Sequence, residues 1–252
     1  MLLALCIAGC SPAPGGIKKE SAASRRQDAA RVHTDLGQQY LVQGRLELAL
    51  EKLQKALSYD SSYVDAHTVI AVLYERIGDD ANAEQHYRRA AQLRPKGGAE
   101  LNNYGTFLCG TGRYDEAEGY FQRAVADPFY RTPAVALANS GSCLLKAGHR
   151  DAAEKVLRQA LQRDPANAAT LLQLAHVSYE SGDYFSARGF MQRHEAAAPA
   201  SADALMLGRN IELKLGDARG VGNYTRKLLQ GFPESREAQS LNVAIQRDAK
   251  TR

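Results

Sequence analysis

Apolar and small residues recur along this chain at helical spacing, with polar residues between them. In residues 30–63 the pair Leu36-Gly37 is followed by Ala49 and then Leu53. Apolar residues three and four apart lie on one face of a helix. Small residues let two helices approach closely, and larger ones fill the space beside them. The pattern therefore predicts two packed helices in this window.

The same arrangement returns along most of the chain. The windows are residues 30–63, 64–97, 98–131, 134–167, 168–201 and 202–235. Near the middle of each stands one glycine, and these are Gly44, Gly78, Gly112, Gly148, Gly182 and Gly216. Successive glycines are 34, 34, 36, 34 and 34 residues apart. We expect each glycine to end a first helix in the left-handed conformation, which a residue with Cβ disfavours.

A period of 34 residues with this pattern resembles the tetratricopeptide repeat. The resemblance implies an all-α fold, a right-handed superhelical solenoid of about six tetratricopeptide helix hairpins. In the sixth window Arg209 and Val221 stand where small residues are expected, so we predict a degenerate end repeat. We expect one further helix, from Glu234 to about Asp248, to cover the exposed end as a C-terminal capping helix.

The first residues are apolar from Leu2 to Ile7 and lead through Ala8 and Gly9 to Cys10. The apolar run is too short to span a bilayer as a helix. Small residues before a cysteine resemble the lipobox of exported bacterial lipoproteins. The resemblance implies cleavage before Cys10 and acylation of that cysteine.

This interpretation divides the chain into three parts. Residues 1–9 are a lipoprotein signal remnant, residues 10–27 hold the lipidated cysteine and a flexible tether, and residues 28–252 form the solenoid. No Lys or Arg precedes Cys10, although export signals begin with positive charge, so we expect the natural chain to start upstream of Met1. Ser11 is compatible with transfer of the lipoprotein to the outer membrane.

Charge and candidate chemistry narrow the function classes. The net charge of +4 is spread along the chain, without the basic stripe and interleaved aromatics typical of nucleic-acid binders. A short cluster at Lys18, Lys19, Arg25 and Arg26 is interpreted as solvated linker, with contact to anionic lipid headgroups as the alternative. No histidine pairs with another ligand at metal-binding spacing, and no phosphate loop or nucleophile elbow is found. We expect no enzyme activity, metal, cofactor or small-molecule substrate.

Two cysteines, Cys109 and Cys143, stand in the first helices of neighbouring windows. The simpler interpretation is a pair of small buried residues. The alternative is a disulfide, which an oxidising compartment permits where the two Cα atoms come within about 7 Å.

In tetratricopeptide solenoids the first helices line a concave face that binds extended peptides or helices. The residues expected on that face are Gln38, Leu41, Val42, Thr68, Val72, Asn102 and Thr106. This set is mildly apolar and uncharged, and it lacks the combined set of Lys and Asn residues with which some relatives hold a terminal carboxylate. We therefore expect a partner strand or helix to bind through apolar side chains.

The period lengthens by two residues at Asp127–Pro133, between the third and fourth windows. One interpretation is a loop insertion, which costs little stability. The other is a partner-contact loop, because Phe129 and Tyr130 stand beside Arg131, a composition typical of binding hot spots.

The third window carries a more specific resemblance. It reads Leu101-Asn102-Asn103-Tyr104-Gly105, then Arg113-Tyr114-Asp115-Glu116-Ala117, and then the aromatic-proline connection Phe129–Pro133. These segments resemble the type IV pilus biogenesis lipoproteins of the PilF/PilW family. The resemblance implies a pilotin, lipid-anchored in the inner leaflet of the outer membrane and facing the periplasm. It would bind subunits of the pilus secretin and promote their outer-membrane localisation and multimerisation. Two alternatives are a scaffold in outer-membrane protein assembly and a regulator of a cell-wall enzyme.

Overall fold

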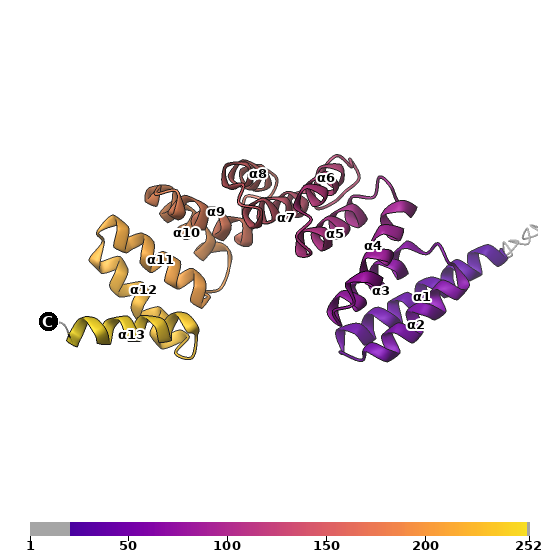
Figure 1. Cartoon of the computed structure of the whole chain (residues 1–252), viewed down its shortest axis with the longest axis horizontal. Coiled ribbons are helices and arrows are strands. Elements are labelled where there is room, and N and C mark those ends of the chain that lie inside the picture. The colour runs from indigo at the N-terminus through magenta and orange to yellow at the C-terminus, as the bar shows by residue number, and fades with distance from the viewer. Residues whose placement is uncertain (1–20, 251–252) are drawn as a thin grey trace, which may run out of the picture. The chain divides into compact units, whose positions relative to one another are not determined.

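A computed structural model describes residues 21–250, with side-chain surroundings for residues 21–247. The described residues form thirteen helices and no strand (Figure 1). The helices are α1 (Ala22–Val42), α2 (Leu46–Tyr59), α3 (Val64–Arg76), α4 (Asp80–Leu93), α5 (Gly98–Gly110), α6 (Tyr114–Val125), α7 (Pro133–Lys146), α8 (Arg150–Arg163), α9 (Ala168–Glu180), α10 (Tyr184–Ala197), α11 (Ala202–Leu215), α12 (Ala218–Gly231) and α13 (Arg236–Lys250). The predicted all-α repeat fold is confirmed. The predicted signal remnant and Cys10 lie outside the described residues.

The chain divides into two compact units, at Asp79. Unit 1 contains α1 to α3, and unit 2 contains α4 to α13. In unit 1, α1 begins at Ala22, where the side chain of Ser21 accepts a hydrogen bond from the Ser24 backbone amide at 3.0 Å. This is a usual helix N-cap. Residues 22–27, which we assigned to the tether, are therefore the first turns of α1.

All six turn glycines have the left-handed backbone conformation that we predicted. Their φ angles lie between 74° and 82°, and no other described residue has a positive φ. At the end of α1, the amide of Gly44 donates to the Leu41 carbonyl and the amide of Arg45 donates to the Tyr40 carbonyl. These bonds satisfy carbonyls that the helix end would otherwise leave without partners.

A second set of small residues explains how closely the helices of a hairpin pack. A Cβ atom added at Gly37, Gly105 or Gly141 would lie about 2.5–3.0 Å from the side chain sixteen residues later, on the second helix. Gly208 lies against Tyr224 in the same way.

The sixth repeat is therefore not degenerate at this contact. Its small residues are Gly208, which packs against Tyr224, and Gly220, which packs against Glu212. We had expected small residues at Arg209 and Val221, one position later in each case. Our positions for the sixth repeat were one residue too late because they were counted from its turn glycine, Gly216. In α11 one more residue stands between the close-packed Gly208 and that turn glycine than in the earlier repeats.

The last helix covers the end of unit 2. Leu205 of α11, Leu228 of α12, and Ala238 and Leu241 of α13 form one buried apolar cluster. Figure 1 shows α13 in yellow beside the α11–α12 hairpin. The predicted C-terminal capping helix is confirmed, and it begins at Arg236.

Candidate partner-binding surface

In unit 1, four of the predicted surface residues lie on the exposed or half-exposed side of α1 and α3. Val42 is 79% exposed and follows Gln38 by one helical turn. On α3, Val72 is 41% exposed and follows Thr68 by one turn. We call these four residues the valine strip. It offers apolar side chains without charge, the composition that the sequence predicted for the concave face.

Leu41 does not belong to this surface, contrary to our prediction. It is only 6% exposed and packs with Ile70 and Leu73 in the core of unit 1. Leu41 stands four residues after the close-packed Gly37, and Cys109 stands four residues after the equivalent Gly105. Both side chains are buried, so this place in the repeat faces the neighbouring first helix.

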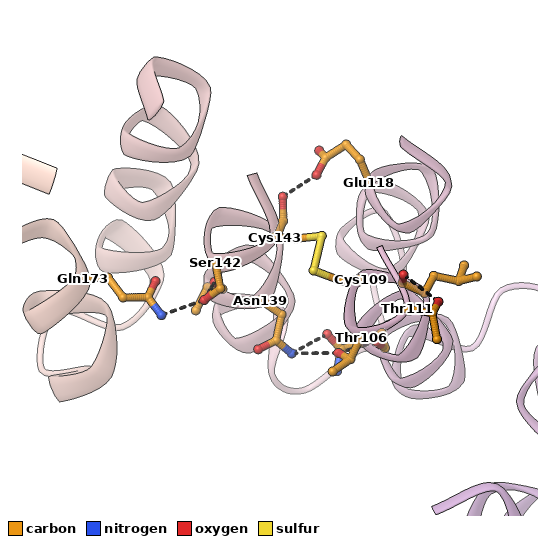
Figure 2. Close-up of a disulfide and its surroundings, with 12 residues drawn as sticks. Thr106, Cys109, Thr111, Glu118, Asn139, Ser142, Cys143 and Gln173 are labelled. Carbon is orange, nitrogen blue, oxygen red and sulfur yellow. Dashed lines mark hydrogen bonds between the residues drawn. A yellow bond between two sulfur atoms is a disulfide. The ribbon is translucent and has the colours of Figure 1, made fainter. Parts of the chain in front are cut away.

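In unit 2, the first helices carry a row of hydrogen-bonded polar side chains, which we call the polar ladder (Figure 2). Asn139 of α7 donates from Nδ2 to Oδ1 of Asn102 at 3.0 Å and to Oγ1 of Thr106 at 3.3 Å, both on α5. Gln173 of α9 donates from Nε2 to Oγ of Ser142 on α7 at 2.6 Å. The ladder therefore joins three successive first helices.

Sequence reasoning placed two of the five ladder residues on the concave face and missed the others. Thr106 is exposed, as expected for such a residue, whereas Asn102 is buried. The spacing of the repeats could have identified two of the missed residues. Ser142 follows Thr106 by 36 residues, and Gln173 follows Asn139 by 34.

A disulfide joins α5 to α7 beside the ladder. Cys109 and Cys143 form this bond, with their Cα atoms 5.7 Å apart. Our simpler interpretation, two buried thiols, is wrong, and the alternative is correct. The cysteines lie one helical turn after Thr106 and Asn139, so the covalent tie and the hydrogen bonds hold the same helix pair (Figure 2). The adjacent first helices pack closely enough at these positions to satisfy the distance limit.

The two-residue insertion gives a loop with one exposed aromatic residue. Phe129 is 88% exposed and lines a hollow of about 620 Å³ together with Pro95, Lys96 and Arg123. Tyr130, in contrast, packs its ring against Gly98, where a Cβ atom would collide with it. Phe129 therefore remains a candidate contact residue, whereas the half-buried Tyr130 anchors the loop.

Asp127 fixes the shape of this loop. Its carboxylate accepts hydrogen bonds from the backbone amides of Gly98 and Phe129, each at 2.9 Å. One contact reaches the start of α5, and the other closes the turn. Both carboxylate oxygens of Asp127 therefore have backbone donors, and Asp127 lines the hollow together with the cationic Lys96 and Arg123.

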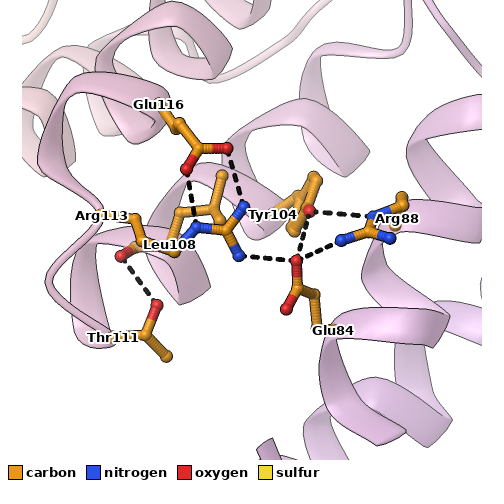
Figure 3. A network of polar contacts seen from close by, with 7 residues as sticks. All are labelled: Glu84, Arg88, Tyr104, Leu108, Thr111, Arg113 and Glu116. Atoms are coloured by element: carbon orange, nitrogen blue, oxygen red, sulfur yellow. Dashed lines mark hydrogen bonds and ion pairs between the residues drawn. The ribbon is translucent and has the colours of Figure 1, made fainter. Parts of the chain in front are cut away.

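The Glu84 carboxylate of α4 lies at the centre of a hydrogen-bond network between the second and third repeats (Figure 3). Glu84 accepts hydrogen bonds from Tyr104 at 3.1 Å, from Arg113 at 2.6 Å and from Arg88. The bond from Arg113 is the main reason that the pKa of Glu84 is lowered. Burial raises the pKa of the Tyr104 phenol, which therefore stays a donor at neutral pH. Much of the sequence signature of this repeat consequently serves packing between α4, α5 and α6.

The remaining candidate chemistry has structural explanations. His67 is buried and its Nε2 lies 3.1 Å from the Ser61 carbonyl oxygen, while His33 stacks on Tyr59. His149 is exposed, as predicted. Within residues 21–247, no three His, Cys, Asp or Glu side chains are grouped to hold a metal ion. None of the described helices is long and apolar enough to cross a bilayer.

Known protein families match most of the repeat region. Models described as tetratricopeptide repeats match residues 37–78, 64–96, 101–127 and 144–211. The tetratricopeptide fold is a protein-interaction fold, which agrees with a surface built for contact with another polypeptide.

Individual relatives come from type IV pilus systems. The chain is 28% identical to the type IV pilus assembly protein PilF of Pseudomonas aeruginosa over 243 residues, 96% of each chain. The crystal structure of PilW, a widely conserved type IV pilus biogenesis factor, is 30% identical with a TM-score of 0.78, and the match covers 84% of this chain and 97% of PilW. The solved structure of Pseudomonas aeruginosa PilF is 27% identical with a TM-score of 0.79, covering 87% and 99% of the two chains.

Proposed function

The chain belongs to the PilF/PilW family of type IV pilus biogenesis proteins built from tetratricopeptide repeats, and on this premise we propose that it is a pilotin. In this proposal it binds subunits of the pilus secretin and promotes their delivery to the outer membrane and their assembly into a multimer. The mechanism is non-catalytic, because the repeats bind the cargo and a lipid on Cys10 carries the complex outward.

The lipid anchor rests on the sequence. The Ile7-Ala8-Gly9-Cys10 segment fits lipoprotein processing, and Ser11 fits sorting to the outer membrane. Several acyl chains on one residue hold a protein stably at a bilayer, because each buried methylene contributes about 0.8 kcal/mol. The repeats would then lie in the periplasm, attached to the inner leaflet of the outer membrane.

One observation carries the cargo-binding part of the proposal, namely the exposed valines of unit 1. Val42 and Val72 leave apolar surface in water on first helices. Covering such surface with a partner's apolar side chains is favourable by roughly 25 cal/mol per Å². Gln38 and Thr68 of the strip add no charge, and a nearby charged side chain is the exposed Arg76, which donates from Nη1 to the Leu41 carbonyl beside Val42 at 2.8 Å. An uncharged face of a secretin segment therefore meets no like charge here.

A matched pair of substitutions tests this surface. Val42→Glu places a charge in the valine strip, and Val243→Glu places the same charge at another exposed valine, on α13. Both variants should keep the helical circular dichroism of the parent protein. We expect secretin subunits to co-purify with the parent and with Val243→Glu, and binding to Val42→Glu to fall at least about tenfold.

Two outcomes would contradict the proposal. Equal secretin binding by both variants would exclude the valine strip as the contact surface. Absence of secretin binding by the parent would remove the pilotin function altogether. Co-purification of nascent outer-membrane barrel proteins or of a cell-wall enzyme in its place would favour one of the two alternatives.

A further inference from the structure

Each repeat has one residue directly before its close-packed small residue, and this position differs in the fourth repeat. In the other five repeats it is a large residue, and these are Leu36, Ile70, Tyr104, Leu174 and Leu207. In the fourth repeat it is Ser140. In the second, third, fifth and sixth repeats this large side chain is buried and fills space between its own first helix and the second helix of the preceding repeat. Leu36 of the first repeat has no preceding repeat and is 36% exposed.

The third repeat shows how that space is filled. Tyr104 of α5 is buried and its hydroxyl donates to the Glu84 carboxylate of α4 at 3.1 Å. Glu118 of α6 follows Glu84 by 34 residues and so takes the same place for the fourth repeat. The hydroxyl of Ser140 donates to Glu118 Oε2 at 2.6 Å. The carboxylate is present in both repeats, but the aromatic ring is present only in the third.

A hollow lies where the ring is missing. Its volume is about 510 Å³, within the range of sites that hold ligands. It lies between α6, α7 and α8, with apolar walls that include Phe121, Val125, Leu137 and Val156. Ser140 and Glu118 form a polar part of the lining (Glu118 is labelled in Figure 2).

We propose that this hollow receives a tyrosine side chain from a partner polypeptide. The apolar walls cover the ring, and Glu118 accepts a hydrogen bond from the phenol as Glu84 does from Tyr104. Glu118 has capacity for this bond. Its Oε1 accepts from Gln122 at 3.1 Å and its Oε2 from Ser140, and each carboxylate oxygen can accept two hydrogen bonds.

This site is separate from the valine strip and does not depend on the secretin being the partner. The valine strip lies on α1 and α3 of unit 1, whereas the hollow belongs to unit 2 alone. The two surfaces can therefore be tested independently, and failure of one leaves the other intact.

The test uses p-cresol, the side-chain analogue of tyrosine, as the probe. The ¹H–¹⁵N spectrum of the processed chain is titrated with p-cresol and, in parallel, with toluene, which has the same ring but no hydroxyl. We expect p-cresol to shift saturably the amide signals around Ser140 and Val156, and to bind about fivefold more tightly than toluene.

Two variants of Ser140 separate filling of the hollow from loss of the fold. Ser140→Tyr supplies the missing ring from within and should raise the melting temperature while abolishing the p-cresol shifts. Ser140→Ala keeps the hollow and frees one acceptor site of Glu118, so p-cresol binding should persist. Shifts scattered over the protein, equal binding of toluene, or unchanged p-cresol binding by a folded Ser140→Tyr variant would each overturn the proposal.

Discussion

The first helices of the two units present opposite chemistry at similar places in the repeat. The valine strip of unit 1 leaves apolar side chains in water, with Val42 almost fully exposed. In the polar ladder of unit 2 the side chains bond to one another across α5, α7 and α9, and a disulfide also joins α5 to α7. One repeat scaffold therefore carries one surface whose apolar groups are exposed to water and another whose polar side chains bond to one another, although the buried Oε1 of Gln173 has no hydrogen-bond partner.

This difference between the valine strip and the polar ladder indicates which of the two would contribute more to the affinity for a partner polypeptide. Covering exposed apolar side chains gains free energy directly. Polar groups that already bond to one another must exchange those bonds for bonds to the partner, and the net gain per bond is small. We therefore expect the valine strip to provide affinity, and the ladder to contribute less.

The largest expected effect separates core from surface within unit 1. Leu41→Glu places a carboxylate among Ile70 and Leu73 and should lower the free energy of unfolding by at least about 3 kcal/mol. Val42→Glu, one residue later on α1, should change it by less than about 0.5 kcal/mol. Urea unfolding followed by circular dichroism measures both. Similar losses in the two variants would show that the burial of Leu41 is misassigned.

The disulfide should distinguish the two units by their response to reduction. Closing a loop of 34 residues stabilises a fold by about 4 kcal/mol, and the described part of unit 1 contains no cysteine. Reductant should therefore speed hydrogen exchange of amides in α5 and α7 and leave α1 to α3 unchanged. The denatured processed protein should have no free thiol, because Cys10 is acylated in our account. Two free thiols from Cys109 and Cys143 would contradict the bond.

Loss of one ladder residue should have a smaller effect, on stability. Asn139→Ala removes the donor that joins α7 to Asn102 and Thr106. The free energy of unfolding should fall by about 1 kcal/mol, because the buried Oδ1 of Asn102 loses this donor. Urea unfolding followed by circular dichroism gives the number, and a variant as stable as the parent would contradict this role of the ladder. Ser58→Ala, at an exposed position of α2 in unit 1, is a control that removes a surface hydroxyl away from the ladder.

The smallest effect concerns acid stability. The pKa of Glu84 is lowered in the folded protein, chiefly by the hydrogen bond from Arg113. A lowered pKa stabilises the fold above the ordinary carboxyl value of 4.5, and this contribution is lost as the pH falls through the folded pKa. Glu84→Gln should cost under about 1 kcal/mol at neutral pH, and the difference from the parent should shrink below about pH 4. A difference that is constant with pH would contradict this role.

The sequence predicted the repeat architecture well because it rests on local rules. The amino-acid sequence directly shows the turn glycines, the small residues sixteen positions before a large one, and the helical periodicity. Which face a residue occupies depends on the neighbouring helix. The position of Leu41 was misassigned for that reason, because its place in the repeat faces α3 and not the open surface.

The other errors also concern contacts between distant residues. Tyr130 is half-buried because Gly98, at the start of α5, leaves room for its ring. The two cysteines are 34 residues apart whereas their repeats are 36 apart, so repeat spacing alone did not place them opposite each other. Three ladder residues were missed because the predicted concave-face residues came only from the first three repeats. Asn139 and Ser142 stand in the fourth repeat, and Gln173 stands in the fifth.

The proposed pilotin function requires that assembly of the pilus secretin depends on this chain. Outer-membrane fractions of the native host, with and without the gene for this chain, are blotted for the heat-resistant secretin multimer. We expect the multimer to be lost, or its subunits to collect in another fraction, when the chain is absent. We also expect recovery with the parent chain and not with Val42→Glu. A multimer unchanged in amount and location without this chain would contradict the claim.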